Sequence, residues 1–306
     1  MLALPTSLSD LSALTDWTEL CCLVRRSKSI SFEDIIGELK RVGEDNPERE
    51  EHEATIDSAF QTPAEDIWAY LDSRSKRAQS GYPFTLDDAR LILRTDAPAS
   101  NAYCFALVCA RLPHDPNGAD LFEDLCAGAL SRYSGARSKV IRFGSPRRDP
   151  VPTGFSDAVE YVSRQCCEGE GAHIVNTRND TGDESIDLVA WKPFPDELTG
   201  RLMLVGSCAS GKDWVEKRLS EPRWDTFADY MLSRPAVSAT RMFFTTHCLD
   251  EPIEWAKITR QSRSIMMDRC RIAAVMGMRD TRTINSNLGV WCRSGISRLA
   301  STPLRW

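Results

Sequence analysis

The sequence lacks the long apolar runs of membrane-spanning helices, which need about 20 consecutive apolar residues. Its first residues show no basic region followed by an apolar core, so we expect no secretory signal. It has only 4 histidines, and its 11 cysteines form no C-x-x-C pair, so zinc-ribbon and thioredoxin-like motifs have no support. Most cysteines lie in apolar segments, where cysteine behaves as a small hydrophobic residue. We therefore expect a reduced, cytoplasmic protein with no membrane partner.

Neither sign of charge dominates the whole chain, but charge is unevenly distributed along it. The net charge is -6, yet residues 257–306 hold ten basic residues and two aspartates, and residues 132–148 hold six basic residues and no acid. Such segments can be a solvated surface, an intramolecular contact between the halves, or a surface that binds phosphates. On the last interpretation, the candidates for contacts to a DNA backbone are Arg132, Arg137, Lys139, Arg142, Arg147 and Arg148, with the C-terminal arginines.

The first hundred residues show mainly helical patterns. Ser31 precedes a stripe of apolar residues as an N-cap, Pro63 suits the first position of a helix that ends near residue 74, and Thr85 suits the cap of another. The turn-forming segment H-D-P-N-G at 114–118 marks the best boundary. We expect a helical N-terminal domain over residues 1–115, which could bind a protein partner or form a homodimer, and a second domain over residues 116–306 that ends in a basic tail.

The second domain shows alternating helix and strand patterns. We expect helices over 155–166 and 213–219, and strands over 173–177, 186–191, 201–206 and 240–246. The strand at 201–206 is apolar on both faces, so it should lie in the centre of the sheet. The expected fold class is α/β with a mixed central sheet.

Two neighbouring segments carry the most informative chemistry. G-D-E-S-I-D-L-V-A-W at 182–191 places Asp187 within an apolar strand, and L-V-G-S-C-A-S-G-K at 204–212 leads from the next strand to Lys212. A buried acid is costly unless a metal ion or hydrogen bonds offset the cost. An acid and a lysine on adjacent strands can hold a metal ion and polarise a water beside a phosphate.

The α-β-β-β-α-β order and these two segments resemble the PD-(D/E)XK superfamily of restriction-endonuclease-like nucleases, and the resemblance covers about residues 153–246. It implies hydrolysis of phosphodiester bonds in DNA with Mg²⁺ or Mn²⁺, in the setting of prokaryotic restriction or antiphage defence. It also implies that Asp187 and the backbone carbonyl of Cys208 bind the metal, and that Lys212 orients the attacking water.

The second segment departs from the (D/E/Q)-x-K pattern of that superfamily. Ser207 stands where the acid or amide belongs, and Ala209 stands where the lysine belongs. One interpretation is that Lys212 supplies the lysine function, while Glu160 or Glu184 supplies the missing acid. The other is that the site is inactive and the domain is a nuclease-like scaffold that binds nucleic acid or protein.

A third interpretation comes from another class of protein. Residues Gly206–Lys212 fit the phosphate-binding pattern G-x-x-x-x-G-K, between an expected strand and an expected helix. However, Asp213 replaces the Ser or Thr that would bind Mg²⁺, and its charge would repel phosphates. The preceding strands also look antiparallel, whereas such a loop normally begins a parallel unit. A P-loop nucleotide-binding protein is therefore the second alternative.

Overall fold

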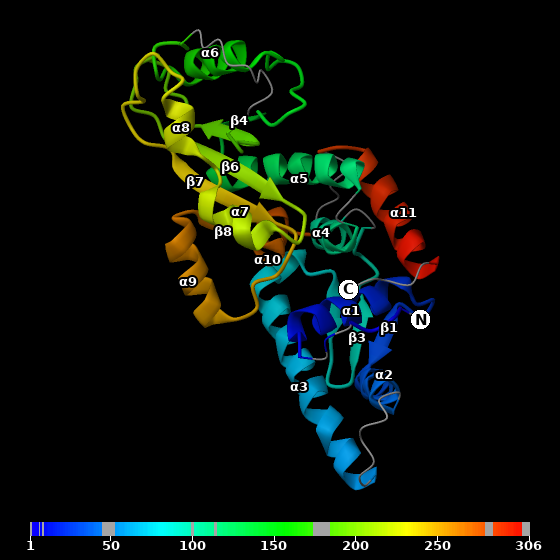
Figure 1. The fold of residues 1–306 in the computed structure, drawn as a ribbon. Coiled ribbons are helices and arrows are strands. Elements are labelled where there is room, and N and C mark those ends of the chain that lie inside the picture. The colour runs from blue at the N-terminus through cyan, green and yellow to red at the C-terminus, as the bar shows by residue number, and fades with distance from the viewer. Residues whose placement is uncertain are drawn as a thin grey trace. The chain divides into compact units, whose positions relative to one another are not determined.

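The computed structural model describes the chain apart from residues 1, 6, 8, 45–52, 99–100, 113–114, 174–183, 279–283 and 302–306. The described residues form an α/β protein with eleven α-helices, a three-stranded sheet and a five-stranded mixed sheet (Figure 1). The chain divides into two compact units: unit 1 comprises Met1–Leu112 and Arg269–Trp306, and unit 2 comprises Pro113–Asp268. The first division lies beside the expected boundary, but residues 269–306 group with the N-terminal residues.

Unit 1 is mainly helical. Its elements are α1 (Leu11–Val24), β1 (Ser29–Ser31), α2 (Phe32–Glu44), α3 (Glu53–Ala78), the 3-10 helix η1 (Gln79–Gly81), β2 (Phe84–Leu86), β3 (Arg90–Leu93), α4 (Ala102–Arg111), α10 (Arg269–Met276) and α11 (Asn287–Ser301). The strands form an antiparallel sheet in the order β1-β3-β2. The expected cap at Ser31 is confirmed, because its Oγ accepts the Asp34 N–H at 3.1 Å and its own N–H donates to Asp34 Oδ2 at 2.9 Å.

Two expectations for unit 1 are wrong. Pro63 does not begin a helix but lies inside the continuous α3. The helix expected after Thr85 is instead the β2–β3 hairpin. Asp87 explains the hairpin, because its Oδ1 accepts the N–H groups of Ala89 and Arg90 at 3.0 and 2.5 Å and so stabilises the turn.

The C-terminal residues belong to unit 1 because they help to build its core. Arg269 is fully buried, and its guanidinium forms an ion pair with Asp16. The same carboxylate lies 2.7 Å from Arg74 Nη1 and 2.7 Å from Arg111 Nη2. In addition, a Cβ on Gly81 would lie 2.0 Å from the carbonyl oxygen of Ala273, so η1 packs directly on the backbone of α10.

Unit 2 contains the mixed sheet. Its elements are α5 (Pro116–Ser134), β4 (Lys139–Arg142), α6 (Phe155–Cys166), β5 (Leu188–Trp191), β6 (Met203–Ala209), α7 (Trp214–Ser220), α8 (Trp224–Ala228), β7 (Thr240–Thr245), α9 (Pro252–Ser262) and β8 (Ile265–Met267). The strand order is β4-β5-β6-β7-β8. The pairs β4–β5 and β5–β6 are antiparallel, and the pairs β6–β7 and β7–β8 are parallel. The expected mixed sheet is therefore confirmed.

Helices cover both faces of this sheet. Apolar side chains of α6 and α8 form one core with Val189 of β5 and Val205 of β6. Alternation along β6 places Cys208 on the other face, where its thiol shares a hydrogen bond with Cys126 of α5. Helix α5 thus lies against the opposite face, over β4, β5 and β6.

The first strand of the sheet is not the expected one. The segment Lys139–Arg142, whose basic residues predict part of a DNA-binding surface, forms β4 and pairs with β5. Of the expected strand at 173–177, residues 174–177 lie outside the described part of the chain, and His173 follows an isolated bridge between Ala172 and Met231. Helix α6 therefore lies between β4 and β5 in the sequence, and α5 is the helix that precedes the three antiparallel strands.

Candidate functional site

Asp187 immediately precedes β5, and both neighbouring strands hold its backbone. Its N–H donates to the Gly206 carbonyl at 2.9 Å, while its carbonyl accepts the N–H groups of Phe143 at 2.7 Å and Gly144 at 3.2 Å. Its Oδ2 also accepts the backbone N–H of Cys208 at 2.6 Å. Backbone groups from both sides therefore fix the position of this half-buried carboxylate.

Glu123 of α5 brings a second carboxylate to the same place. A Cβ on Gly144 would lie 2.8 Å from Asp187 Oδ1 and 3.4 Å from Glu123 Oε2. The first distance is shorter than real Cβ contacts, so only glycine lets the chain pass between these groups without displacing one of them. Two acids from different elements thus flank one residue, and carboxylate oxygens are the donors that Mg²⁺ and Mn²⁺ prefer.

The acids of α5 form a wider cluster with two arginines. Asp120, Glu123 and Asp124 share one helical face because they are three or four residues apart. Arg142 of β4 lies 3.0 Å from Asp120 and 2.6 Å from Asp124, and it also pairs with Glu123. Arg148 forms further ion pairs with Asp120 and Asp124. Three carboxylates therefore face two guanidinium groups.

Burial and neighbouring charges shift two pKa values in this cluster. Burial raises the pKa of Glu123, and the charges of Asp120 and Asp124 act in the same direction against the opposing effect of Arg142. Burial disfavours the charged form of Arg142, but Glu123 and the bonded aspartates hold its pKa above the ordinary value. A carboxyl group with a raised pKa beside further acids is typical of functional sites.

Lys217 of α7 pairs with Asp213, and the charge of Asp187 also favours its protonated form. Its Nζ lies 3.0 Å from Asp213 Oδ2. Burial lowers the pKa of Lys217, but the negative charges of Asp213, Glu221 and Asp187 raise it above the ordinary value. Lys212, which we expected in this role, lies exposed in the turn after β6 and forms no ion pair with any residue that the structure describes.

Ser207 forms a hydrogen bond with Glu221, the residue that follows α7. Its Oγ, which is buried in β6, donates to Glu221 Oε2 at 2.9 Å. The Glu221 N–H donates to the Lys217 carbonyl at 2.9 Å and closes the helix. At the position where the (D/E/Q)-x-K pattern has an acid or amide, the strand supplies a hydroxyl, and the residue that caps the following helix supplies a carboxylate.

Glu160 and Glu184, the two acids expected to assist Asp187, have other partners. Glu160 lies 2.6 Å from Arg164 Nε and accepts the Ala172 N–H at 2.6 Å, so it fixes the chain after α6. Glu184 accepts the hydroxyl of Tyr230 at 3.1 Å and lies 3.8 Å from Arg223. The acid that meets Asp187 at Gly144 is Glu123.

The six basic residues expected to contact DNA differ in their surroundings. Arg142 and Arg148 pair with the acids of α5, as described above. The guanidinium of Arg147 lies over the rings of Phe143 and Phe155, with centroid distances of 4.7 and 5.5 Å. Arg132 is half-buried in the last turn of α5, whereas Arg137 and Lys139 are exposed.

Cys208 and Cys126 lie beside the two acids as neutral thiols. Their side chains share a hydrogen bond, and burial raises both pKa values above that of an ordinary thiol. A thiol must lose its proton to bind a metal well, so these sulfurs do not suit a metal ligand set. The group of Cys208 that contacts Asp187 is its backbone N–H.

The segment Gly206–Lys212 is not a free phosphate-binding loop. Its first four residues belong to β6, which is antiparallel to β5. A Cβ on Gly206 would lie 2.9 Å from the ring of Phe244, so this glycine makes room for an aromatic side chain. The Cys208 N–H donates to Asp187 rather than pointing into an open loop. The geometry gives no support to the P-loop alternative.

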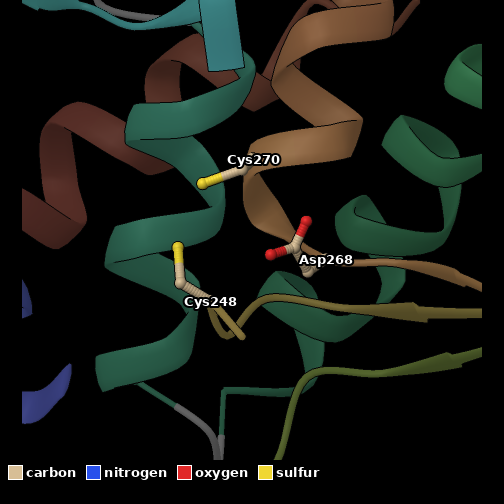
Figure 2. Close-up of side chains that lie close together, drawn as sticks. All are labelled: Cys248, Asp268 and Cys270. Carbon is tan, nitrogen blue, oxygen red and sulfur yellow. The ribbon is translucent and has the colours of Figure 1, made fainter. Parts of the chain in front are cut away.

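A separate pair of possible ligands lies where β7 and β8 end. Cys248 Sγ and a carboxylate oxygen of Asp268 lie within 4.8 Å of each other (Figure 2). Asp268 Oδ2 accepts the Leu249 N–H at 3.2 Å, which holds the loop after β7. Cys270, the third labelled residue, belongs to unit 1, so we assign no metal site to these side chains.

Comparison of this chain with family models, curated proteins and solved structures finds no match. None of the helices in the described residues has the length and apolar character required to cross a bilayer.

Sequence patterns missed Glu123, Lys217 and Glu221, although signals for two of them exist. Glu123 lies in α5, which carries three acids on one face. Lys217 follows Asp213 by four residues, the spacing of an ion pair on a helix. Glu221 gives no comparable signal, because only the bend of the chain after α7 brings it back to Ser207.

Proposed function

We propose that unit 2 is a restriction-endonuclease-like domain of the PD-(D/E)XK type, which hydrolyses phosphodiester bonds in DNA. The element order is α5-β4-α6-β5-β6-α7-α8-β7. It supports the proposal because, with α6 and α8 taken as insertions, three antiparallel strands precede a helix and a strand parallel to the third. The observation that carries it is the meeting of Glu123 and Asp187 at Gly144. Restriction or antiphage defence is the setting that fits this class of enzyme.

The two carboxylates fit a divalent ion with oxygen ligands. Glu123 and Asp187 would hold Mg²⁺ or Mn²⁺, and such ions accept few protein ligands together with several waters. When bound, the ion supplies charge neutralisation at the phosphate and lowers the pKa of a bound water.

Lys217 and Glu221 would supply the lysine and the acid of the (D/E/Q)-x-K pattern, whose positions on β6 are occupied by Ala209 and Ser207. The Lys217 ammonium stays protonated and can stabilise negative charge that develops on the phosphate. Glu221, oriented by Ser207, provides a further carboxylate near that ammonium. Exposed Arg137 and Lys139 are suited to the DNA backbone, so binding should weaken steeply as the salt concentration rises.

The test is cleavage of plasmid DNA by the full chain with Mg²⁺ or Mn²⁺. Asp187→Asn and Glu123→Gln should each lower cleavage at least about 100-fold, the scale of losing a metal ligand or its orientation. Glu160→Gln is the matched control, because this acid lies in unit 2 with other partners, and it should retain cleavage. Thermal unfolding checks that each variant folds. Cleavage that survives in both site variants would refute the proposal.

One observation favours the alternative of an inactive nuclease-like scaffold. Arg142 already pairs with Glu123, Asp120 and Asp124, so a guanidinium competes for the carboxylates that would hold a metal ion. Wild-type protein that binds DNA with a steep salt dependence, yet neither cleaves it nor binds Mn²⁺, would support the scaffold.

A further inference from the structure

Unit 1 has an open cavity on its surface, of about 500 Å³, formed by residues of α2, α3 and the β2–β3 hairpin. This volume lies within the range of small-molecule sites, about 300–1,000 Å³. Its described lining residues belong to unit 1, so it is separate from the site proposed for DNA cleavage. The residues that give it chemical character are Phe32, Glu65, Trp68, Asp72, Asp87 and Asp88.

Two aromatic rings provide an apolar wall. Phe32 and Trp68 are perpendicular, with ring centroids 5.6 Å apart. Both side chains are only half-buried, so parts of their rings remain exposed beside the cavity. The face of an indole ring attracts cations more strongly than the rings of Tyr or Phe do.

Among the residues that the structure describes around this cavity, the charged side chains are four carboxylates and none is basic. Asp72 pairs with Lys76 at 2.6 Å, and Asp87 accepts N–H groups of its own turn. Within the described part of unit 1, the donor to Glu65 is the neutral amide of Gln61, at 3.2 Å. The cavity therefore carries excess negative charge, which disfavours phosphates and other anions.

We propose that this cavity binds a small organic cation with an apolar body, of the alkylammonium class. The alkyl body would lie against Trp68 and Phe32, and the ammonium would lie near Glu65 and Asp88. Three independent features support this class of ligand: the volume, the aromatic wall and the sign of the charge. An inorganic metal ion would make no use of the aromatic wall, and a neutral apolar molecule would leave the carboxylates uncompensated.

The experiment is calorimetric titration of the full chain with hexylammonium, and with 1-hexanol as a neutral ligand of the same shape. We expect saturable binding of hexylammonium and at least about tenfold weaker binding of hexanol, since cation–π and charge contacts are lost together. The double variant Glu65→Gln/Asp88→Asn and the single variant Trp68→Leu should each weaken hexylammonium binding at least about tenfold. Asp66→Asn, which removes an exposed acid of α3 outside the lining, should bind as the wild type does.

Thermal unfolding identifies any variant that fails to fold. If Trp68→Leu does not fold, the double variant Glu65→Gln/Asp88→Asn still tests the proposal, because both of its substitutions are at exposed residues. Three outcomes would overturn the proposal: no saturable binding by the wild type, equal binding of hexanol, or unchanged affinity in the folded double variant.

Discussion

Asp187 Oδ1 lies 2.8 Å from the point that a Cβ on Gly144 would occupy. We therefore expect Gly144→Ala to displace the carboxylate and to lower the free energy of unfolding by about 1–3 kcal/mol, the usual cost of overpacking. DNA cleavage should fall with it, because a metal ligand moves. Urea unfolding and the cleavage assay measure the two effects.

Gly37→Ala is the matched control for that substitution. No atom of the described residues lies within 4 Å of a Cβ on Gly37, which is in α2. Alanine there should raise the free energy of unfolding by about 0.5–1 kcal/mol through helix propensity. If both variants behaved alike, the close approach at Gly144 would have no energetic consequence.

Lys217 and Lys212, which both follow β6 in the sequence, should differ in their effect on the rate of DNA cleavage. Lys217→Met removes the ammonium that interacts with Asp187 and should lower cleavage at least about 100-fold, comparable to loss of an electrostatic catalytic group. Lys212→Met removes an exposed lysine and should change the rate less than about threefold. Rates under single-turnover conditions decide between them, and the reverse order of effects would restore Lys212 to the role expected from the sequence.

Arg142 should oppose metal binding at the acidic cluster. In Arg142→Met, three neighbouring carboxylates lose their main partner, so the protein should be less stable without metal by about 1–3 kcal/mol. Mn²⁺ should then raise the melting temperature of the variant more than that of the wild type, because binding to the folded state stabilises it. Equal Mn²⁺-induced shifts in the two proteins would show that Arg142 does not compete with the ion.

Asp16 should make unit 1 sensitive to acid. Burial alone would raise its pKa, but Arg269, Arg74 and Arg111 hold it far below the usual value. A depressed pKa stabilises the fold above the unfolded value of about 3.9, and this stabilisation is lost as the pH falls below that value. The unfolding free energy should therefore fall between about pH 4 and pH 2, with up to about 1.4 kcal/mol per pH unit from this residue.

Asp16→Asn provides the comparison for this pH dependence. The variant should lose about 3–5 kcal/mol at neutral pH, because buried guanidinium groups lose their partner. Its unfolding free energy should fall less steeply below pH 4 than that of the wild type. Identical slopes in denaturant titrations across this range would contradict the assignment.

Local patterns predicted much of unit 2, because its strands and helices follow their own periodicity. The helix at 155–166, the strands around 188–191, 203–209 and 240–245, and the helix after Asp213 all appear close to the expected positions. Strand β4 was missed because Lys139 and Arg142 made it look like a charged surface, whereas α5 neutralises Arg142 in the fold. The acids that neutralise Arg142 belong to α5, so the sequence of the strand alone does not indicate that this arginine is paired.

Within the candidate site, both Ser207 and Asp187 were predictable. The apolar surroundings of Asp187 made this acid conspicuous, and the structure places it between two strands. Glu123 was not, because its proximity to Asp187 depends on how α5 crosses the sheet. In unit 1, Thr85 suggests the cap of a helix, but Asp87 stabilises the turn of the β2–β3 hairpin at 84–93 instead.

The path of the chain has a consequence for biosynthesis. Unit 1 is interrupted after Leu112 and is completed only from Arg269 onwards, so unit 2 is an insertion within it. During translation, Asp16 and Arg74 emerge long before Arg269, their partner in the buried ion network. All the segments of unit 2 leave the ribosome before that partner does. During synthesis, the N-terminal helices therefore cannot complete the core of unit 1 until Arg269 has been made. The inserted unit 2 has its whole sequence available before that point.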